Sequence, residues 1–254
     1  MRRVVVKVGS AVLTQNDAIA LQRMRNLVDF LAELRKENEV ILVSSGAVAA
    51  GYTALRLDRA ILQNKQALAS IGQPILMNKY AKKFAEHDIL TAQVLVTAAN
   101  FNDDDECRRV KDTIDTLLSN GVIPIINEND ATTTKELVVG DNDQLSAYVA
   151  KHTASSLLII LSDIDAYYDK DPRKFDDAKI LKVVHSIDAD ELEKDANPNS
   201  TFATGGIITK LKAANYLLTH NIDMVLTSGY DLSNIRSLML EGEHRGGTLF
   251  TRGF

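Results

Sequence analysis

Two lysines far apart in the chain have the side chains and surroundings that phosphate chemistry requires. Lys7 lies inside the β-branched run of residues 4–8, and a Gly-Ser pair follows that run. A lysine inside such a run is costly unless it reaches a charged partner. Lys210 follows a Gly-Gly pair near the start of a predicted helix, where free N–H groups and the positive end of the helix dipole face outward. Both surroundings suit phosphate.

Each lysine also has an ordinary structural explanation. A lysine in an edge strand discourages pairing with other chains. A Gly-Gly pair before a helix can be a simple cap with a surface lysine nearby. The residues alone leave both explanations open.

A polar stretch, residues 122–143, is the second chemical feature. It begins as a buried strand over residues 122–126 and turns polar at residues 127–130, Asn-Glu-Asn-Asp. A second cluster, Gly-Asp-Asn-Asp at residues 140–143, precedes a predicted helix. Amides and carboxylates beyond the carboxyl end of a parallel strand mark the usual ligand edge of an open α/β sheet. They suit a small charged ligand such as an amino acid, although Asn, Asp and Gly also form ordinary turns.

A third anion-friendly turn, Ser-Ser-Gly-Ala at residues 44–47, follows the predicted strand 40–43. A strand, a small polar turn and a helix of small residues together expose backbone N–H groups to an anion. The same residues could equally form a plain turn with a serine cap.

Repeated strand–helix alternation predicts one α/β domain over residues 1–254, with a mainly parallel sheet. We expect a helical stretch over residues 58–87 to be interrupted near Gly72 and Pro74, giving two helices that cover one sheet face. The predicted strands are residues 4–8, 40–43, 89–96, 122–127, 157–161, 180–184, 223–227 and 247–250. The predicted helices are residues 21–38, 103–120, 144–152, 188–195 and 207–221, with a hairpin over residues 132–139.

Composition excludes several classes of protein. The chain has 254 residues and a net charge of −5, and its basic residues are scattered, so no nucleic-acid partner is expected. The apolar N-terminal run is too short for a signal segment or a membrane span. The single cysteine, Cys107, fits a reducing compartment and is interpreted as an incidental surface or helix residue, so we expect a cytoplasmic protein. The sequence contains no GxxxxGK[ST], GxGxxG, HExxH or CxxC motif and no HRD/DFG pair.

These features together favour phosphoryl transfer, in which a protein mostly positions groups and neutralises charge. A carboxylate acceptor would need no general base, because its pKa of about 4 leaves it ionised at neutral pH. The difficulty is repulsion between two anions, roughly 4 kcal/mol for unit charges about 4 Å apart at an effective dielectric constant of about 20. Two lysines and Mg²⁺ would offset a term of that size.

Five segments, in order, resemble the amino acid kinase family: VVVKVGSAVLT, VSSGAVAAG, IPIINENDA, VGDNDQLSA and ATGGIITKL. The resemblance covers nearly the whole chain and implies a three-layer αβα sandwich around a mainly parallel sheet. The amino acid would lie over its N-terminal half and ATP over its C-terminal half. Within the family the segments resemble the members that phosphorylate the γ-carboxylate of L-glutamate, the first step of proline biosynthesis.

The resemblance also implies roles for single residues. Lys7, Lys210 and Asp143 would be catalytic, with Asp143 organising the two lysines. The implied substrate-binding residues are Ser45, Gly46, Asn127, Asp130 and Asn142, with Asp130 at the α-amino group. The implied nucleotide-binding residues are Lys7, Gly9, Ser10, Ser162, Asp163, Thr204, Gly205, Gly206, Ile207, Ile208, Thr209 and Lys210.

Partners and cofactors follow from the same resemblance. Mg²⁺ would arrive with ATP, with no side chain predicted to ligate it directly. Proline is expected as a feedback inhibitor in or beside the glutamate site, and a homo-oligomer, dimer or tetramer, is expected. Many members carry a C-terminal PUA module, and this chain ends before one.

Two other functions fit the same segments. The acceptor could be acetylglutamate, aspartate, carbamate or UMP, although a nucleotide acceptor would favour arginines over the acidic, amide-rich residues 127–130. A non-catalytic, amino-acid-binding regulator could also use this scaffold, but the presence of all three predicted catalytic residues disfavours it. Ser162 stands where the family commonly has Thr, and Ile207-Ile208 replaces a more usual Met-small pair.

Overall fold

The computed structural model describes residues 1–132, 142–193 and 206–253. Thr204, Gly205 and the predicted hairpin, apart from Thr132, lie outside the described residues.

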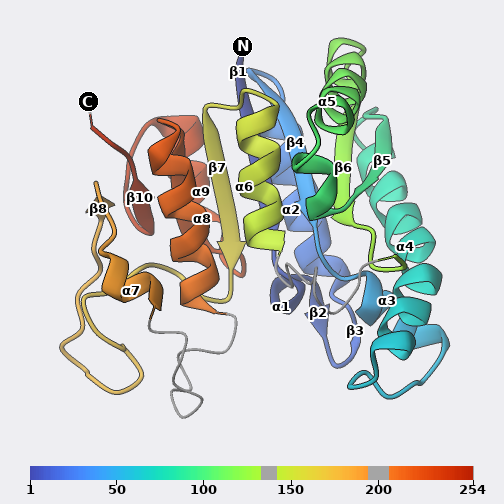
Figure 1. Cartoon of the computed structure of the whole chain (residues 1–254), viewed down its shortest axis with the longest axis horizontal. Helices are drawn as coiled ribbons and strands as arrows, with labels where there is room; N and C mark the ends of the chain where they lie inside the picture. The colour runs from blue at the N-terminus through green and yellow to red at the C-terminus, as the bar shows by residue number, and fades with distance from the viewer. Residues whose placement is uncertain (133–141, 194–205, 254) are drawn as a thin grey trace.

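An eight-stranded sheet forms the centre of the molecule, in the order β5-β6-β4-β1-β7-β9-β10-β8 (Figure 1). All neighbouring strands pair in parallel except β10, which runs antiparallel to β9. The strands are β1 (Arg2–Val8), β4 (Asn38–Ser44), β5 (Thr91–Val96), β6 (Ile123–Glu128), β7 (Leu157–Ser162), β8 (Val183–Val184), β9 (Asp223–Ser228) and β10 (Thr248–Phe250). The predicted strand over residues 180–184 is therefore shorter than expected.

Helices cover both faces of this sheet, so the predicted three-layer αβα sandwich is confirmed (Figure 1). One face carries α2 (Leu21–Leu34), α4 (Leu62–Ala85) and α9 (Ser233–Arg236). The other carries α5 (Asp104–Ser119), α6 (Asn142–His152) and α8 (Ile207–Thr219). Shorter elements are α1 (Ser10–Leu13), β2 (Thr14–Gln15), β3 (Ala18–Ile19), α3 (Ala47–Ala54), η1 (Ala98–Phe101), α7 (Ala189–Glu193) and η3 (Ser237–Glu241).

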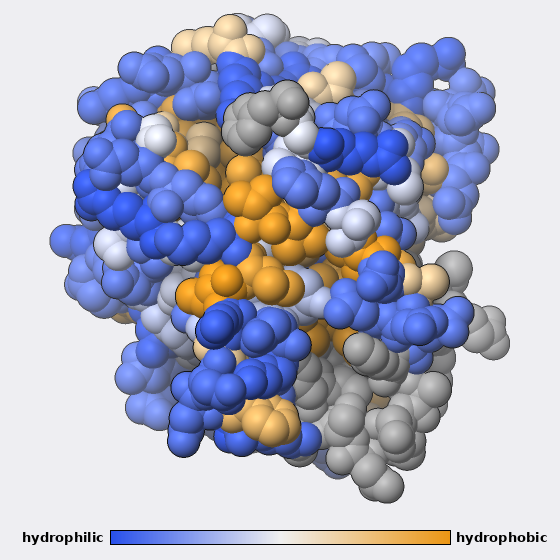
Figure 2. Space-filling view, turned by 90° about the vertical axis from the view of Figure 1, so that its left-hand side faces the viewer, coloured by the Kyte–Doolittle hydropathy of each residue, from blue (hydrophilic) through white to orange (hydrophobic). Residues whose placement is uncertain are grey.

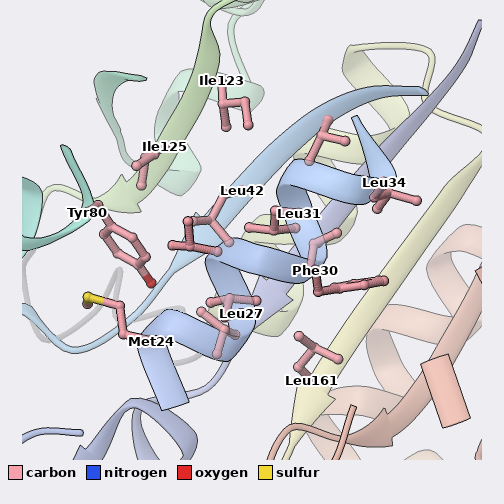
Figure 3. Packing of buried hydrophobic residues seen from close by; sticks show 14 of the residues in the cluster. Met24, Leu27, Phe30, Leu31, Leu34, Leu42, Tyr80, Ile123, Ile125 and Leu161 are labelled. Carbon is pink, nitrogen blue, oxygen red and sulfur yellow. The ribbon is translucent and has the colours of Figure 1, made fainter. Parts of the chain in front are cut away.

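The alternation of side chains along β1 divides the core into two layers and decides which way Lys7 points. Val4, Val6 and Val8 pack in the cluster with α2 and α4, whereas Val5 packs in the cluster with α6 and α8. Figure 3 shows the first cluster, in which residues of α2 lie against β-strand side chains such as Leu42 and Leu161. Because alternate residues of a strand face opposite sides, Lys7 shares the α6 and α8 side with Val5.

The position of β1 removes the edge-strand explanation for Lys7. Strand β1 lies between β4 and β7, and Lys7 stands opposite Val43 on one side and Ile160 on the other. A lysine in the middle of a sheet protects no edge. The lysine is 4% exposed and has an ionic partner, described below.

The predicted interruption near Gly72 and Pro74 is wrong, because α4 runs unbroken from Leu62 to Ala85 with Pro74 inside it. An interior proline costs a helix about 3 kcal/mol. Burial of Leu76 and other side chains of the same helix, together with close packing on α3, offsets that cost. The contact with α3 is backbone to backbone: a Cβ on Gly72 would lie 1.8 Å from the Ala47 carbonyl oxygen.

The face over β8, β10 and the C-terminal end of the chain is shown in Figure 2. Apolar residues gather in its middle and hydrophilic residues surround them. Phe175, Ile180 and Val183, between β7 and the end of β8, are exposed apolar side chains. Within the described residues, no helix combines the length and the apolar character that a membrane crossing requires.

Candidate active site

A cleft of about 660 Å³ opens at the carboxyl ends of the central strands. The chain leaves β1 toward β4 on one side and later returns to β7 on the other, and ligands of open α/β sheets bind at such a switch point. The predicted residues lining this cleft are Lys7, Gly9, Ser10, Ser45, Gly46, Asn127, Asp130, Asn142, Ser162, Asp163, Gly206 and Lys210. Residues from six segments of the chain, at or after β1, β4, β6 and β7 and at the starts of α6 and α8, therefore meet at one place.

The carboxylate of Asp143 joins the two lysines. Lys7 Nζ lies 2.5 Å from Asp143 Oδ1, and Lys210 Nζ lies 2.9 Å from Asp143 Oδ2. Asp143 is fully buried, and each lysine is 4% exposed. The two ammonium groups, which lie 203 positions apart in the sequence (210 − 7), thus reach the same carboxylate.

Three elements hold this ionic cluster. Lys7 comes from β1, Asp143 from the first turn of α6 and Lys210 from the first turn of α8. Lys210 Nζ also donates to the Gly206 carbonyl at 2.9 Å, and Thr209 Oγ1 donates to Asp143 Oδ2 at 2.9 Å. An acidic residue in the first turn of a helix is favoured by the helix dipole.

Among the described residues, two ammonium groups, those of Lys7 and Lys210, pair with the single carboxylate of Asp143. A buried charge is tolerated only when it is paired and hydrogen-bonded, because desolvation of an unpaired ion costs several kcal/mol. Both lysines line the cleft, and ammonium groups at such a place are suited to an anionic ligand.

A second set of polar side chains lies beside the ionic cluster. Asn142 Nδ2 donates to Ser45 Oγ at 2.7 Å and to Asn127 Oδ1 at 3.0 Å. These residues come from α6, the turn after β4 and the end of β6. The polar residues predicted at the ends of β4 and β6 therefore meet the start of α6, although sequence places them far apart.

The turn after β4 depends on Gly46. Its φ of 108° lies in the left-handed region, which a glycine adopts without strain. Gly46 caps α3, and Ser45 N–H donates to the Val8 carbonyl at 3.3 Å. The turn is thereby tied to the end of β1, one residue from Lys7.

Asp130 stands at the same end of the cleft, after β6, and is partly buried. Burial raises the pKa of its carboxyl above the ordinary value of 3.8, and the positive charge of Lys65 lowers that pKa in part. A partly desolvated carboxylate of this kind gains from a cationic ligand more than an exposed one does.

Only some of the residues predicted to bind the nucleotide line the cleft. Gly9, Ser10, Ser162, Asp163 and Gly206 line the cleft, and Ser162 Oγ donates to Asp163 Oδ1 at 3.0 Å. Two other predicted nucleotide-binding residues, Ile207 and Ile208, do not line the cleft with their side chains. Both side chains are buried in the core against α6 and neighbouring strands.

Several cleft residues were missed by the sequence prediction. Arg59, Lys65 and Gln66 line the cleft, and they come from the stretch that we interpreted only as a cover for the sheet. Glu128, within the predicted polar cluster 127–130 but without a role of its own there, also lines it. Gln73, on α4, is buried and hydrogen-bonded to Asn127. It occupies the apolar stripe of α4 among Ala69, Leu76 and Tyr80 and could have been found as a polar residue at an apolar position.

The described residues contain no group of three or more His, Cys, Asp or Glu side chains arranged to hold a metal ion. Asp143, the most central carboxylate, already accepts hydrogen bonds from Lys7 on one oxygen and from Lys210 and Thr209 on the other.

Cys107, predicted to be an incidental surface or helix residue, is buried in α5 with its Sγ 2.7 Å from His152 Nδ1. Burial raises the pKa of the Cys107 thiol, and burial also lowers the pKa of His152. Both shifts favour the neutral forms, which is typical of a packed hydrogen bond rather than a reactive thiol.

The sandwich, the switch-point cleft and the paired lysines define a class of phosphotransferase. The chain matches the amino acid kinase family over residues 2–228, and it belongs to that family.

The curated relatives are more specific. The chain is 54% identical over 258 residues to glutamate 5-kinase of Wolinella succinogenes, a match that covers 100% of this chain and 99% of that enzyme. It is 51% identical over 250 residues to glutamate 5-kinase of Leishmania donovani, with 98% of this chain and 95% of that enzyme covered. Among solved structures, an isopentenyl phosphate kinase shares the fold with a TM-score of 0.69 and 17% identity, covering 98% of this chain and all of that one.

The ionic cluster predicts a large effect of Asp143→Asn on stability. The substitution keeps the volume of the side chain and removes the carboxylate that pairs with both buried ammonium groups. We expect the free energy of unfolding, measured by urea denaturation, to fall by about 3–5 kcal/mol. Asp105→Asn removes a carboxylate from an exposed ion pair with Arg108 and should leave the unfolding free energy nearly unchanged. Equal stabilities of the Asp143 variant and the unmodified protein would contradict this account of the cluster.

Proposed function

We propose that this protein transfers the terminal phosphoryl group of ATP to the γ-carboxylate of L-glutamate. The product is L-glutamyl 5-phosphate, and the reaction is the first step of proline biosynthesis. The observation that carries the proposal is the convergence of Lys7 and Lys210 on Asp143 at the switch-point cleft. Relatives of more than 50% identity named glutamate 5-kinase support the choice of acceptor.

In the proposed reaction, a γ-carboxylate oxygen of glutamate attacks the terminal phosphorus of ATP in line with the bond to ADP. A new P–O bond forms to the carboxylate, and the P–O bond to the β-phosphate breaks with its electron pair leaving on ADP. No proton has to be removed, because the attacking carboxylate is already ionised at neutral pH. The enzyme's task is to bring two anions together and to neutralise the charge that develops on the phosphoryl oxygens.

Lys7 and Lys210 perform that neutralisation in the proposal. The Asp143 carboxylate pairs with both ammonium groups and offsets the repulsion between them, so that both can lie at one point of the cleft. The N-terminus of α8, after Gly206, adds the positive end of a helix dipole on the same side. Gly9, Ser10, Ser162 and Asp163 form the rest of the proposed nucleotide side, with Thr204 to Thr209 as the predicted loop before Lys210.

Glutamate binds on the other side of the cleft in this proposal. Asp130 pairs with the α-ammonium group, and the Ser45-Gly46 turn and Asn142 contact the carboxylates, with Asn127 behind them. An ammonium group next to the partly desolvated Asp130 carboxylate would relieve the cost of its burial. Mg²⁺ enters with ATP, since the phosphates supply its oxygen ligands, and it would withdraw charge from the transferred group.

Three further features belong to the same proposal. Proline inhibits by binding at or beside the glutamate site, because it carries the same α-carboxylate and α-amino functions. The protein assembles as a homo-oligomer, a dimer or a tetramer, and resides in the cytoplasm. The whole chain forms one catalytic domain, with the amino-acid side in its N-terminal part and the nucleotide side in its C-terminal part.

The direct test is a coupled ADP-release assay with glutamate, ATP and Mg²⁺, applied to Lys7→Met and Lys210→Met. We expect kcat to fall by about 10²–10³-fold or more in each variant, because each removes a charge that stabilises the transition state. Lys36→Met, at an exposed position after α2, should keep the unmodified rate. Near-normal turnover of both cleft variants would contradict the mechanism.

The same assay run with acetylglutamate, aspartate, carbamate and UMP tests the acceptor. Glutamate should be used with the highest kcat/KM. A preference for another acceptor would replace the proposed substrate, and binding of glutamate without ATP consumption would identify a regulator.

Asp130 predicts a particular dependence of glutamate use on pH. Protonation removes the charge that pairs with the substrate ammonium group, and the raised pKa places this loss at a higher pH than for an ordinary aspartate. We therefore expect kcat/KM for glutamate to fall as the solution is acidified, and the fall to begin at a higher pH than an ordinary aspartate would give. In Asp130→Asn, kcat/KM for glutamate should be lower at neutral pH, and the decrease caused by protonation of Asp130 should be absent. An identical acid limb in both proteins would exclude Asp130 from the role.

A further inference from the structure

A chain of side-chain amides runs from the edge strand β5 to the cleft. Gln73 Nε2 donates to Gln93 Oε1 at 3.1 Å, and Asn127 Nδ2 donates to Gln73 Oε1 at 2.9 Å. Asn142 Nδ2 then donates to Asn127 Oδ1 at 3.0 Å and to Ser45 Oγ at 2.7 Å. Five segments of the fold are linked in this way, namely β5, α4, β6, α6 and the turn after β4, and the series of hydrogen bonds ends at the Ser45 hydroxyl, which lines the cleft.

One backbone N–H group determines which side chain donates and which accepts in each of these hydrogen bonds. The N–H of Glu128 donates to Asn127 Oδ1 at 3.0 Å. Because a backbone N–H only donates, the atom of Asn127 that faces it is the carbonyl oxygen. The NH₂ group of Asn127 therefore faces Gln73, which must present its own carbonyl oxygen in return. On the other side, Asn142 must present its NH₂ group to the same Asn127 oxygen.

This order of donors and acceptors makes the Ser45 hydroxyl an acceptor toward Asn142 and a donor toward the cleft. Ser45 Oγ accepts a hydrogen bond from Asn142, so the hydroxyl proton of Ser45 is the part of the group available to a ligand in the cleft. A carboxylate is an acceptor only and pairs with such a donor. A Ser45 hydroxyl rotated the other way would present lone pairs and repel a carboxylate.

Gln73 Oε1 is the buried acceptor that holds the amide of Asn127 in this orientation. It is 7% exposed, on α4, and lines a smaller cavity of about 210 Å³ next to Asp130 rather than the main cleft. Its backbone position is set by Gly72, where α4 touches the backbone of α3 at Ala47 and Gly51. The contact leaves little freedom for Gln73 to move away from Asn127.

We propose that Gln73 is a positioning residue for the acceptor substrate, acting through Asn127 and Asn142 to hold Ser45 as a hydrogen-bond donor. This inference rests on the proposed function and assigns Gln73 a part in recognising the carboxylate of glutamate. Gln73 does not reach the ionic cluster in this role, so it affects glutamate binding and leaves the handling of ATP alone.

The test is the Gln73→Met variant, which keeps the length of the side chain and removes its acceptor. Loss of a buried hydrogen-bond partner frees Asn127 to turn, and we expect KM for glutamate to rise about ten- to hundredfold. The KM for ATP and kcat at saturating glutamate should stay within about threefold, a split that general damage to the fold would not produce. Gln63→Met, at an exposed position of the same helix, is the matched control and should leave all three values unchanged.

Gln73→Glu keeps an oxygen that accepts from Asn127, and it should raise KM for glutamate less than Gln73→Met does. A double-mutant cycle with Ser45→Ala tests the connection. Once the Ser45 hydroxyl is absent, Gln73→Met should add little further to KM for glutamate, because both changes act through the same group. Full additivity of the two changes, or an unchanged KM for glutamate in Gln73→Met, would overturn the inference.

These results separate the inference from the proposed function. An unmodified protein that does not phosphorylate glutamate would contradict both. An active unmodified protein with normal glutamate KM in Gln73→Met would contradict the role of Gln73 and leave the proposed function standing.

Discussion

The fold depends on one buried carboxylate that serves two buried ammonium groups. Asp143 is fully buried and contacts Lys7 and Lys210 at 2.5 and 2.9 Å. Since an unpaired charge in the interior costs several kcal/mol, charge pairing favours the arrangement of β1, α6 and α8 that brings these three side chains together. Charge pairing therefore holds the two cationic groups at one point of the cleft, where the proposed phosphoryl transfer needs them.

The first turn of α6 connects the two sides of the cleft. Asp143 points to the lysines, whereas its neighbour Asn142 donates to Ser45 and Asn127 on the amino-acid side. A shift of this turn would disturb both sets of contacts together. The proposed binding of glutamate and the proposed handling of the phosphoryl group are thus coupled through adjacent residues, while the close α3–α4 contact at Gly72 supports the amide chain from behind.

Much of this arrangement could be predicted from the sequence because strand ends in a parallel sheet meet at one edge. The alternation of elements predicted one α/β domain with a mainly parallel sheet, and the family resemblance implied the three-layer sandwich and brought Lys7, Asp143 and Lys210 together. Gln73 was not predicted, because a single helix position does not reveal which strand end it faces. Pro74 was expected to break α4, since local propensity takes no account of the packing that offsets its cost. Ile207 and Ile208 matched a nucleotide motif by position, but their side chains serve the core.

The central claim is that Lys7 and Lys210 act on the same phosphoryl group. A crystal structure of the protein with glutamate, Mg²⁺ and a non-hydrolysable ATP analogue tests it most directly. The account predicts both Nζ atoms at about 3 Å from oxygens of the terminal phosphate, with Asp143 still bridging the two lysines and a glutamate γ-carboxylate oxygen facing the terminal phosphorus. A complex in which the two lysines contact different ligands, or in which the terminal phosphate lies away from either Nζ, would contradict it.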